Sequence, residues 1–299
     1  MGKYFLKLDK FDSENLDDDI IDPNKYYNVF NPSLLYSGEL VYVTFRAFSN
    51  KNNLPFHSFM IIYDKESKFK KEINLTDICL SFNILNCSDP KLLFLGKDIW
   101  VTFNTGYTIC QNSIYLLKVS GEIGKPFECI LTNRTKIEKN WAFFLKDQLI
   151  HAIYSLTPFR EIYLTRIDEE ANVFYFEFAK DPQHFLNNKP NLHLSIGTQL
   201  SNKEGMNYLI AHRKIIILNK KIYIGYLVQI NEFDIKVLPK RLFHSYLSLF
   251  GSLKKFNKTI ISCTYFSGLF IHEETFIISY GINDNSFAIK MVPFRSLCE

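Results

Sequence analysis

Pro32-Ser-Leu-Leu-Tyr-Ser-Gly-Glu-Leu-Val-Tyr-Val-Thr-Phe-Arg46 is followed further along the chain by Pro90-Lys-Leu-Leu-Phe-Leu-Gly-Lys-Asp-Ile-Trp-Val-Thr-Phe-Asn104. The two stretches align without a gap, and seven of their fifteen positions are identical. Each has an apolar run, a turn with glycine and a second apolar run, which is the pattern of a β-hairpin. Because this hairpin recurs, the sequence indicates a repeat architecture.

Looser copies follow, with roughly fifty to sixty residues between most occurrences, and they occupy residues 140–154, 197–212 and 267–280. Such a period is typical of β-propeller blades. We therefore predict an all-β fold, a five-bladed β-propeller, formed as one domain by residues 1–299. Residues 1–28 would be a lead-in strand and loop, and the blades would open near residues 31, 89, 140, 197 and 267.

The composition favours strands and a large core. Apolar residues make up 47% of the chain and aromatic residues 16%, with 28 Phe and 17 Tyr, and aromatic side chains are common in strands. We expect the outer strands of the blades at residues 56–63, 113–119, 161–167, 173–178 and 222–230. Residues 181–191 hold two prolines and three asparagines and are expected to form a loop.

The charge and the cysteines exclude several classes of function. The formal net charge of +4 is too small to indicate binding of a nucleic-acid polymer, and the lysine runs at 65–71, 220–221 and 254–255 are typical of solvated turns or edge strands. The six cysteines have no CxxC spacing and the histidines no ligand spacing, so we expect reduced thiols, no metal and no cofactor. We find neither a signal peptide nor a transmembrane segment and expect a cytoplasmic protein.

The hairpin geometry predicts where the polar residues meet. In an antiparallel hairpin the first strand begins at the end where the second strand finishes. Around a propeller axis, the residues that open and close each hairpin should therefore gather at one mouth of the channel. The opening residues are Asn31, Asp89, Asn140, Trp141 and Thr198, and the closing residues are Arg46, Asn104, Ser155, His212, Asn283 and Asp284. Further candidate binding residues stand next to them, at Lys91, Lys139 and Arg213. A polar mouth with few charges suits a polyol such as a sugar.

Asp89 is the candidate catalytic residue. The proline after it favours an extended conformation, from which the carboxylate would reach into the channel as a proton carrier. An ordinary Asp-Pro turn is the alternative. Asn31 stands at the same place in the first repeat and cannot take up a proton at neutral pH. A hydrolase with two carboxylates would need another acid, for which Asp284 and Glu204 are candidates unless they only form turns.

Other residues have the chemistry to bind a sugar or its phosphate. Trp141 offers an aromatic face next to the amide of Asn140, although it could equally be a core residue. Arg46 could bind a phosphate or carboxylate through two hydrogen bonds, or could form a surface ion pair. His212 could be a catalytic or a structural hydrogen-bonding residue.

Together these segments resemble the five-bladed propeller family of β-mannoside phosphorylases, glycoside hydrolase family 130, and the related β-1,2-mannosyltransferases and glycosyltransferase-like proteins. The resemblance runs from about residue 29 to the C-terminus, and its pieces are residues 31–47, 89–91, 138–141, 153–158, 197–199, 208–213, 267–269 and 279–284. It implies that Asp89 is the general acid or base, acting on the glycosidic oxygen directly or through a sugar hydroxyl. Phosphate, or a sugar-phosphate leaving group, would supply the other half of the chemistry.

One segment departs from the phosphorylases. Residues 104–111 lack the arginines with which those enzymes bind phosphate, so transfer from an activated sugar is at least as well supported as phosphorolysis. We therefore predict an inverting glycosyltransferase of cell-surface or capsular glycan synthesis, with Asp89 as acid/base and Arg46, Lys139 and Arg213 neutralising the donor phosphate. Its partners would be a nucleotide sugar or sugar phosphate and a glycan acceptor. The alternatives are a β-mannoside phosphorylase, a glycoside hydrolase, and a non-catalytic propeller that binds glycan or protein.

Overall fold

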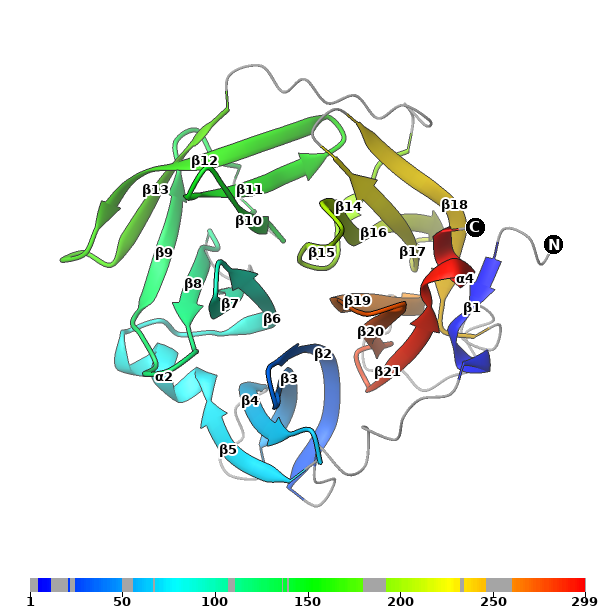
Figure 1. The fold of residues 1–299 in the computed structure, drawn as a ribbon, viewed down its shortest axis with the longest axis horizontal. Helices are drawn as coiled ribbons and strands as arrows, with labels where there is room; N and C mark the ends of the chain where they lie inside the picture. The colour runs from blue at the N-terminus through cyan, green and yellow to red at the C-terminus, as the bar shows by residue number, and fades with distance from the viewer. Residues whose placement is uncertain are drawn as a thin grey trace.

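The computed structural model describes residues 5–11, 21, 25–49, 56–66, 68–106, 111–135, 137–138, 140–179, 192–231, 234–245 and 260–298. The described part is an all-β propeller, in which antiparallel meanders stand around a central axis (Figure 1). The predicted loop at residues 181–191 lies outside the described residues. No helix in the described ranges has the length and apolar character needed to cross a membrane.

The first two meanders correspond to the two matching sequence repeats, and each pairs its strands in chain order. The first consists of β2 (Tyr26–Ser37), β3 (Leu40–Ser49), β4 (His57–Asp64) and β5 (Phe69–Asn74). The second consists of β6 (Ser88–Leu95), β7 (Asp98–Asn104), β8 (Ile114–Lys118) and β9 (Pro126–Leu131). Gly38 and Gly96 have positive φ angles of 60° and 67° in the tight turns of the matching hairpins, where glycine meets no steric cost.

The later meanders come from the looser copies. The third consists of β10 (Ala142–Lys146), β11 (Leu149–Leu156), β12 (Phe159–Asp168) and β13 (Val173–Phe178). The fourth consists of β14 (Ser195–Ile196), β15 (Ser201–Lys203), β16 (Met206–Ile217), β17 (Lys220–Ile230) and β18 (Ile235–Phe243), and the last of β19 (Ile260–His272), β20 (Thr275–Ile282) and β21 (Ser286–Pro293). The strands predicted outside the hairpins are thereby confirmed, with their ends within three residues of the predicted ones.

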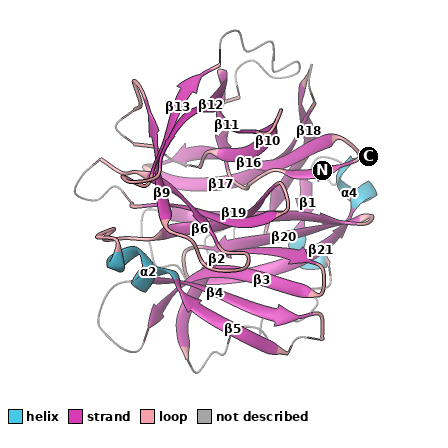
Figure 2. Ribbon diagram, turned by 60° about the vertical axis from the view of Figure 1, so that its left-hand side comes forward, coloured by secondary structure: helices cyan, strands magenta, loops and turns pink. Residues whose placement is uncertain are grey.

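The remaining elements are short and lie at the periphery (Figure 2). β1 (Phe5–Lys7) pairs in parallel with β18 and leads into a 3-10 helix, η1 (Leu8–Lys10). The helix α2 (Leu75–Ser81) follows β5, where the Asn74 side chain caps it by accepting hydrogen bonds from the N–H groups of Thr76 and Asp77. The helix α4 (Phe294–Cys298) ends the described chain.

The core lies between the meanders and closes them into a ring. Each pair of successive meanders shares one cluster of buried apolar side chains. The last meander shares a further cluster with the first, in which Ile277 and Ile289 pack with Val43, Phe45 and Phe59. The number of blades stays a prediction, because parallel pairing of β9 with β13 and of β17 with β19 joins the meanders into three hydrogen-bonded sheets.

Buried hydroxyl groups fix the inner strands of neighbouring meanders against one another. The Ser33 hydroxyl accepts a hydrogen bond from the Leu92 N–H at 3.0 Å, and the Thr44 hydroxyl donates to the Pro90 carbonyl at 3.0 Å. On the other side, the Ser267 hydroxyl donates to the carbonyl next to Ser33, at Pro32. These hydrogen bonds need a fixed register between the meanders, so they also fix the positions of the residues that open each hairpin.

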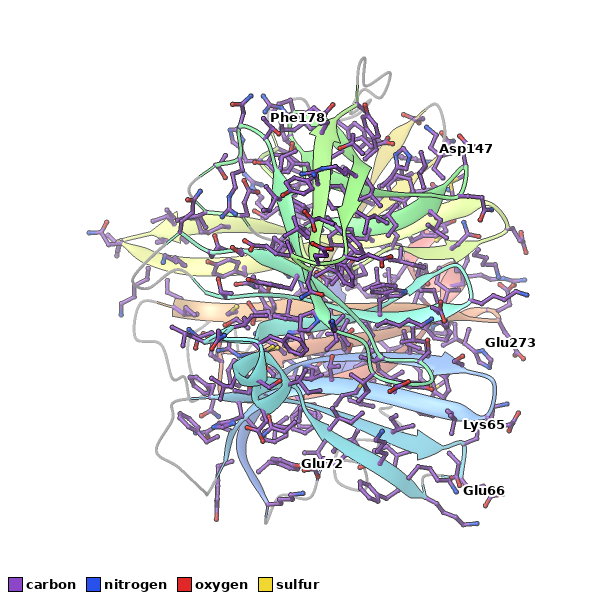
Figure 3. All side chains as sticks on the ribbon, turned by 90° about the vertical axis from the view of Figure 1, so that its left-hand side faces the viewer. Lys65, Glu66, Glu72, Asp147, Phe178 and Glu273 are labelled. Carbon is purple, nitrogen blue, oxygen red and sulfur yellow. The ribbon has the colours of Figure 1, made fainter. Side chains whose placement is uncertain are left out.

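The two ends of the ring differ. The tight turns that carry Lys65, Asp147 and Glu273 lie together at one end (Figure 3). The residues that open and close the hairpins, such as Asn31 with Arg46 and Ser88 with Asn104, lie at the other end, as antiparallel pairing requires.

Candidate active site

A β-bulge opens each of the first two hairpins. The register of β2 with β3 shifts between Phe30 and Ser33, and that of β6 with β7 shifts between Ser88 and Lys91. Inside these bulges Asn31 and Asp89 have φ angles of 52° and 50°. The expected extended conformation of Asp89 is thus wrong. The bulge requires the left-handed region, which Asn and Asp enter more readily than other residues with a side chain.

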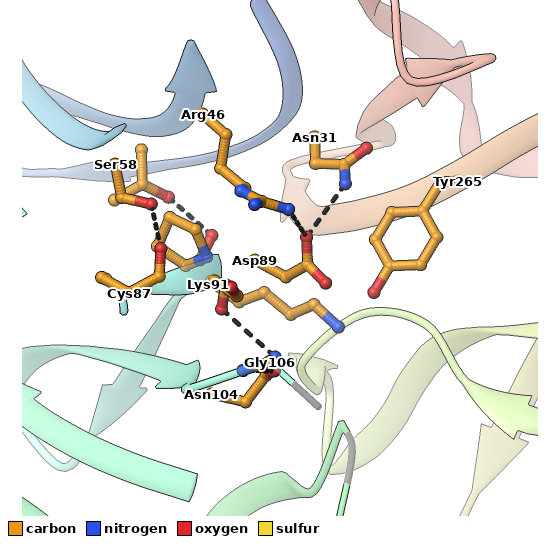
Figure 4. Close-up of polar contacts among 12 residues, drawn as sticks. Asn31, Arg46, Ser58, Cys87, Asp89, Lys91, Asn104, Gly106 and Tyr265 are labelled. Carbon is orange, nitrogen blue, oxygen red and sulfur yellow. Dashed lines mark hydrogen bonds and ion pairs between the residues drawn. The ribbon is translucent and has the colours of Figure 1, made fainter. Parts of the chain in front are cut away.

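The Asp89 carboxylate is the focus of this end of the ring. Its Oδ1 accepts hydrogen bonds from Asn31 Nδ2 at 3.0 Å and from Arg46 Nη1 at 3.2 Å, and Figure 4 shows both side chains pointing toward it. The Arg46 guanidinium lies over the rings of Phe30 and Phe56, at 5.0 and 5.1 Å from their centroids. The carboxylate is 21% exposed and Arg46 19%, so the ion pair is partly desolvated but still reachable.

A cavity of about 470 Å³ opens beside Asp89. Side chains from the second, third, fourth and last meanders form its wall, among them Asp89, Asn140, Ser155, His212, Lys214, Lys221, Tyr223 and Tyr265. The predicted gathering of opening and closing residues therefore places Asp89, Asn140, Ser155 and His212 on one cavity. The volume lies within the usual range of small-molecule sites.

Lys91 is buried below the cavity, with 2% of its surface exposed. Its Nζ donates to Asn140 Oδ1 at 2.7 Å and to the Gly197 carbonyl at 2.5 Å, and it lies 5.6 Å from the centre of the Tyr265 ring. A buried ammonium needs such partners, because an uncompensated charge in the interior is costly. Lys91 therefore joins the second, third, fourth and last meanders under the site.

His212 is neutral in this environment. Burial, and next the charge of Lys91, lower its pKa to about 3. Its Nε2 accepts a hydrogen bond from the Phe266 N–H at 2.8 Å, and its ring stacks on Tyr265 with the centroids 4.9 Å apart. This ring nitrogen is thus occupied by the backbone of the last meander. His212 positions β16 against β19 and is a poor candidate for a general base at neutral pH.

Tyr265 is held as a neutral phenol. Burial, and next the negative charge of Asp89, raise its pKa well above 10. Its hydroxyl donates to Asn140 Oδ1 at 3.4 Å. The phenol can therefore donate a hydrogen bond at the cavity wall but cannot take a proton from a substrate.

A second carboxyl group lies within electrostatic range of Asp89. Burial, and next the charge of Asp89, raise the pKa of Asp284, while Arg46 lowers it. Asp284 stands in the turn between β20 and β21, with a φ angle of 54°. The alternative acid, Glu204, is exposed in the turn between β15 and β16, at the opposite end of the hairpin from His212.

Three predicted binding residues hold the backbone. Asn104, Thr198 and Asn283 are at most 4% exposed. The Asn104 side chain donates to the Ser88 carbonyl at 3.2 Å, and the Thr198 hydroxyl accepts from the Ile210 N–H at 2.9 Å. Asn283 Oδ1 accepts from a backbone N–H of β19 at 2.7 Å. These side chains fix the backbone at the hairpin ends and do not line the cavity.

The structure places Trp141 in the core, where it is 1% exposed. Its indole N–H donates to Glu138 Oε2 at 3.0 Å, and its ring packs against Phe143 and Tyr154. No face of the ring is open for stacking a sugar in this arrangement. Lys139, predicted beside it, lies outside the described residues.

No family model and no curated protein matches the sequence. The structure, however, is similar to that of a GDP-Man-dependent mannosyltransferase from Leishmania mexicana, with 12% identity over 95% of this chain and 88% of that one and a TM-score of 0.59. It is also similar to a β-1,2-mannobiose phosphorylase from Listeria innocua, with 12% identity over 91% of each chain and a TM-score of 0.52.

A third similar structure belongs to glycoside hydrolase family 130, which contains mannoside phosphorylases and hydrolases of β-1,2-mannosidic linkages in Candida mannan. It is 10% identical over 91% of this chain and 86% of that one, with a TM-score of 0.57. Identities this low show a shared fold. The chain has the fold of carbohydrate-active enzymes.

The sequence reasoning missed the cations of the cavity wall. It singled out Arg213, but Lys214 and Lys221 line the cavity and Arg213 does not appear in its wall. Side chains alternate between the two faces of a strand, so Lys214 shares the face of His212 and Arg213 takes the other. Ile216, two residues after Lys214, lies on the same face, and Lys221 pairs with it across the hairpin. Lys221 therefore shares that face too. Counting in twos from His212 would have found Lys214, and the cross-strand pairing of Ile216 would then have found Lys221.

Within the described ranges, no three His, Cys, Asp or Glu side chains gather as a metal site would require.

Proposed function

We propose that the protein is a glycosyltransferase in which Asp89 takes a proton from the acceptor hydroxyl. The observation that carries this proposal is the placement of the Asp89 carboxylate on a polar cavity of about 470 Å³ that Lys214 and Lys221 also line. A carboxylate and two ammonium groups on one cavity suit an acceptor hydroxyl and an anionic leaving group.

The reaction divides among these residues. Asp89 accepts the acceptor proton as the acceptor oxygen bonds to the anomeric carbon and the bond from that carbon to the donor phosphate breaks. The leaving phosphate keeps the electron pair of the broken bond, and Lys214 and Lys221 stabilise its negative charge. Arg46 is already committed to Asp89, so it orients the base. A single displacement of this kind inverts the anomeric centre.

A nucleoside-diphosphate sugar is the donor class we propose. It needs cations for two phosphates, which the lysine pair offers. The mannosyltransferase of similar fold uses GDP-Man. This likeness supports the donor class.

A glycoside hydrolase is the second candidate, and Asp284 is the observation in its favour. Burial and the charge of Asp89 raise its pKa, which favours the protonated acid, while Asp89 is paired with Arg46. Two carboxyl groups with divergent proton affinities are the usual pair of acid and base in glycoside hydrolysis. In this reading Asp284 protonates the leaving oxygen and Asp89 activates a water molecule.

One experiment separates the two candidates. The protein is incubated with nucleotide sugars, sugar 1-phosphates and manno-oligosaccharides, and products are followed by mass spectrometry. Transfer predicts release of a nucleoside diphosphate that Asp89→Asn abolishes and Asp284→Asn largely spares. Hydrolysis predicts release of reducing sugar that both variants abolish. Asp98→Asn is the matched control, because Asp98 pairs with Lys118 away from the cavity. Turnover that survives Asp89→Asn would refute both readings.

A further inference from the structure

The hairpin between β16 and β17 carries an apolar tip, which we define as residues 214–221. Leu218 is 92% exposed, Ile216 59% and Ile217 46%. The hairpin, drawn in yellow-green in Figure 3, extends past the neighbouring strands at the end opposite Asp147 and Glu273. Single exposed apolar residues are common, but three consecutive ones at a projecting tip mark a contact surface.

The turn itself is chemically unusual. Leu218 and Asn219 have φ angles of 48° and 60°, which is the pattern of a type I′ hairpin turn. Asn suits such a position, whereas the left-handed region is unfavourable for leucine because of its Cβ atom. Leu218 is also almost fully exposed, so it gains no packing in return. We therefore infer that this leucine contacts a binding partner, since departures from local sequence preferences concentrate at functional positions.

Cations surround the apolar tip. Ile216 pairs with Lys221 and Ile217 with Lys220 across the hairpin, and Lys214 is exposed on the first strand. No Asp or Glu occurs between residues 205 and 231. With Arg213, this stretch therefore carries a formal charge of +4, as large as the net charge of the whole chain. The tip is thus an exposed apolar turn flanked by basic side chains.

We propose that this tip docks on an anionic lipid membrane, with Leu218, Ile216 and Ile217 entering the headgroup region and Lys220, which does not line the cavity, contacting lipid phosphates. Exposed apolar residues and adjacent basic residues act together in such binding. A protein partner fits less well, because a stable protein interface buries about 800 Å² on each side and a two-residue turn offers a narrow convex point. The contact is reversible, because three apolar side chains form a weak anchor.

Docking would also orient the cavity. Lys214 and Lys221 lie both in the tip and on the cavity wall, so the face of the hairpin that contacts the cavity runs directly into the apolar turn. A membrane under the tip would place the cavity mouth near the lipid surface. This consequence rests on the proposed function, but the docking itself does not, since it involves no sugar.

The test is sedimentation with vesicles, without donor or acceptor. The vesicles are phosphatidylcholine alone, or phosphatidylcholine with about a third phosphatidylglycerol. We expect binding to the anionic vesicles to fall about tenfold in Leu218→Asn and about tenfold in Ile216→Asn. Lys220→Glu should lower it by about thirtyfold, and high salt should weaken it further. Leu149→Asn is the matched control, because Leu149 is 48% exposed beside the Asp147 turn at the opposite end.

Two results would overturn the proposal. One is that wild type and the three tip variants sediment equally with the anionic vesicles, whether all four proteins bind or none does. The other is a wild-type dimer in sedimentation velocity that Leu218→Asn dissociates, without vesicle binding, because the tip would then contact a second copy of the chain. Thermal unfolding at a temperature no lower than that of wild type shows that each variant is folded, as exposed side chains allow.

Discussion

The first two hairpins of the ring have nearly the same backbone and different chemistry. Asn31 and Asp89 occupy the same bulge, each before a proline and each in the left-handed region. One presents an amide and the other a carboxylate, and the amide donates to the carboxylate at 3.0 Å. The repeat therefore supplies two adjacent positions, and sequence divergence makes one of them a donor that orients the other.

The residues that close these hairpins diverge in the same way. Arg46 closes the first hairpin and reaches across to Asp89 in the second. Asn104 closes the second hairpin and donates within that hairpin, to the Ser88 carbonyl of β6. The first hairpin thus supports the acid of the second, whereas Asn104 supports the backbone of its own hairpin. Function in this ring comes from the asymmetry between repeats that share one geometry.

The largest effect should come from removing that asymmetry. Asp89→Asn makes the second bulge like the first, and we expect turnover to fall by about a thousandfold, the usual range for losing a general base. The double variant Asn31→Asp, Asp89→Asn keeps the charge but should not restore activity, because Asn31 is 4% exposed and Asp89 lines the cavity. Steady-state kinetics measure both variants. Recovery in the double variant would show that the two positions are interchangeable.

A smaller effect is expected from a substitution at the start of the third hairpin, which differs from the starts of the first two. Trp141 follows Asn140 where proline follows Asn31 and Asp89, and its indole binds the buried Glu138. Trp141→Phe removes this charge-assisted hydrogen bond and some packing, so we expect a loss of about 2–3 kcal/mol in the free energy of unfolding. Urea denaturation measures it. The KM for sugar should change little; a large rise in KM without loss of stability would favour the stacking role predicted from the sequence.

A still smaller effect should come from the wall behind Asn31. A Cβ atom added at Gly281 would lie 2.1 Å from Asn31 Oδ1. Gly281→Ala must therefore move the amide that orients Asp89, and overpacking of this kind costs about 1–3 kcal/mol. We expect kcat to fall about tenfold, with the remaining activity still dependent on Asp89. Gly38→Ala is a control with open space around its Cβ, although its positive φ costs some stability. Equal kcat values in the two variants would contradict the role of Asn31.

The sequence predicted the propeller and the mouth that holds Asp89 because both follow from repetition. A hairpin that recurs with its turn glycine fixes strand order, and antiparallel pairing then places Asn31, Asp89 and Arg46 at one end. It did not predict that the bulge puts Asp89 in the left-handed region. Proline restricts its neighbour locally, whereas the bulge arises from pairing with β7 and from hydrogen bonds across meanders.

Burial was the second limit. Trp141, Thr198 and Asn283 open or close hairpins as the pattern indicates, yet they are buried and do not line the cavity. A position in a repeat gives the end of the ring at which a residue lies, but not its depth, which depends on packing between meanders. Lys214 was missed for a simpler reason, since strand alternation from His212 already pointed to it.

The smallest effect concerns the pH dependence of stability, which reports how the charge of Asp89 acts on Asp284. Burial and the charge of Asp89 raise the pKa of Asp284 above its ordinary 3.8. The folded chain therefore keeps a proton that the unfolded chain has lost, and the free energy of unfolding falls as pH rises from 3.8 through the folded pKa. Asp284→Asn removes this loss, so its stability relative to wild type should increase across that window and then level off.

Urea denaturation from about pH 3.5 to 8 measures the relative stability. In the Asp89→Asn background the window should narrow, because one of the two causes of the raised pKa is gone, and burial alone remains. Asp98→Asn is the control of opposite sign: its hydrogen bond with Lys118 lowers the pKa of Asp98, so the stability it contributes is lost as pH falls. If the window of Asp284 were unchanged in Asp89→Asn, the charge of Asp89 would not reach Asp284. The hydrolase reading, which needs the two carboxyl groups to act as a pair, would then lose its support.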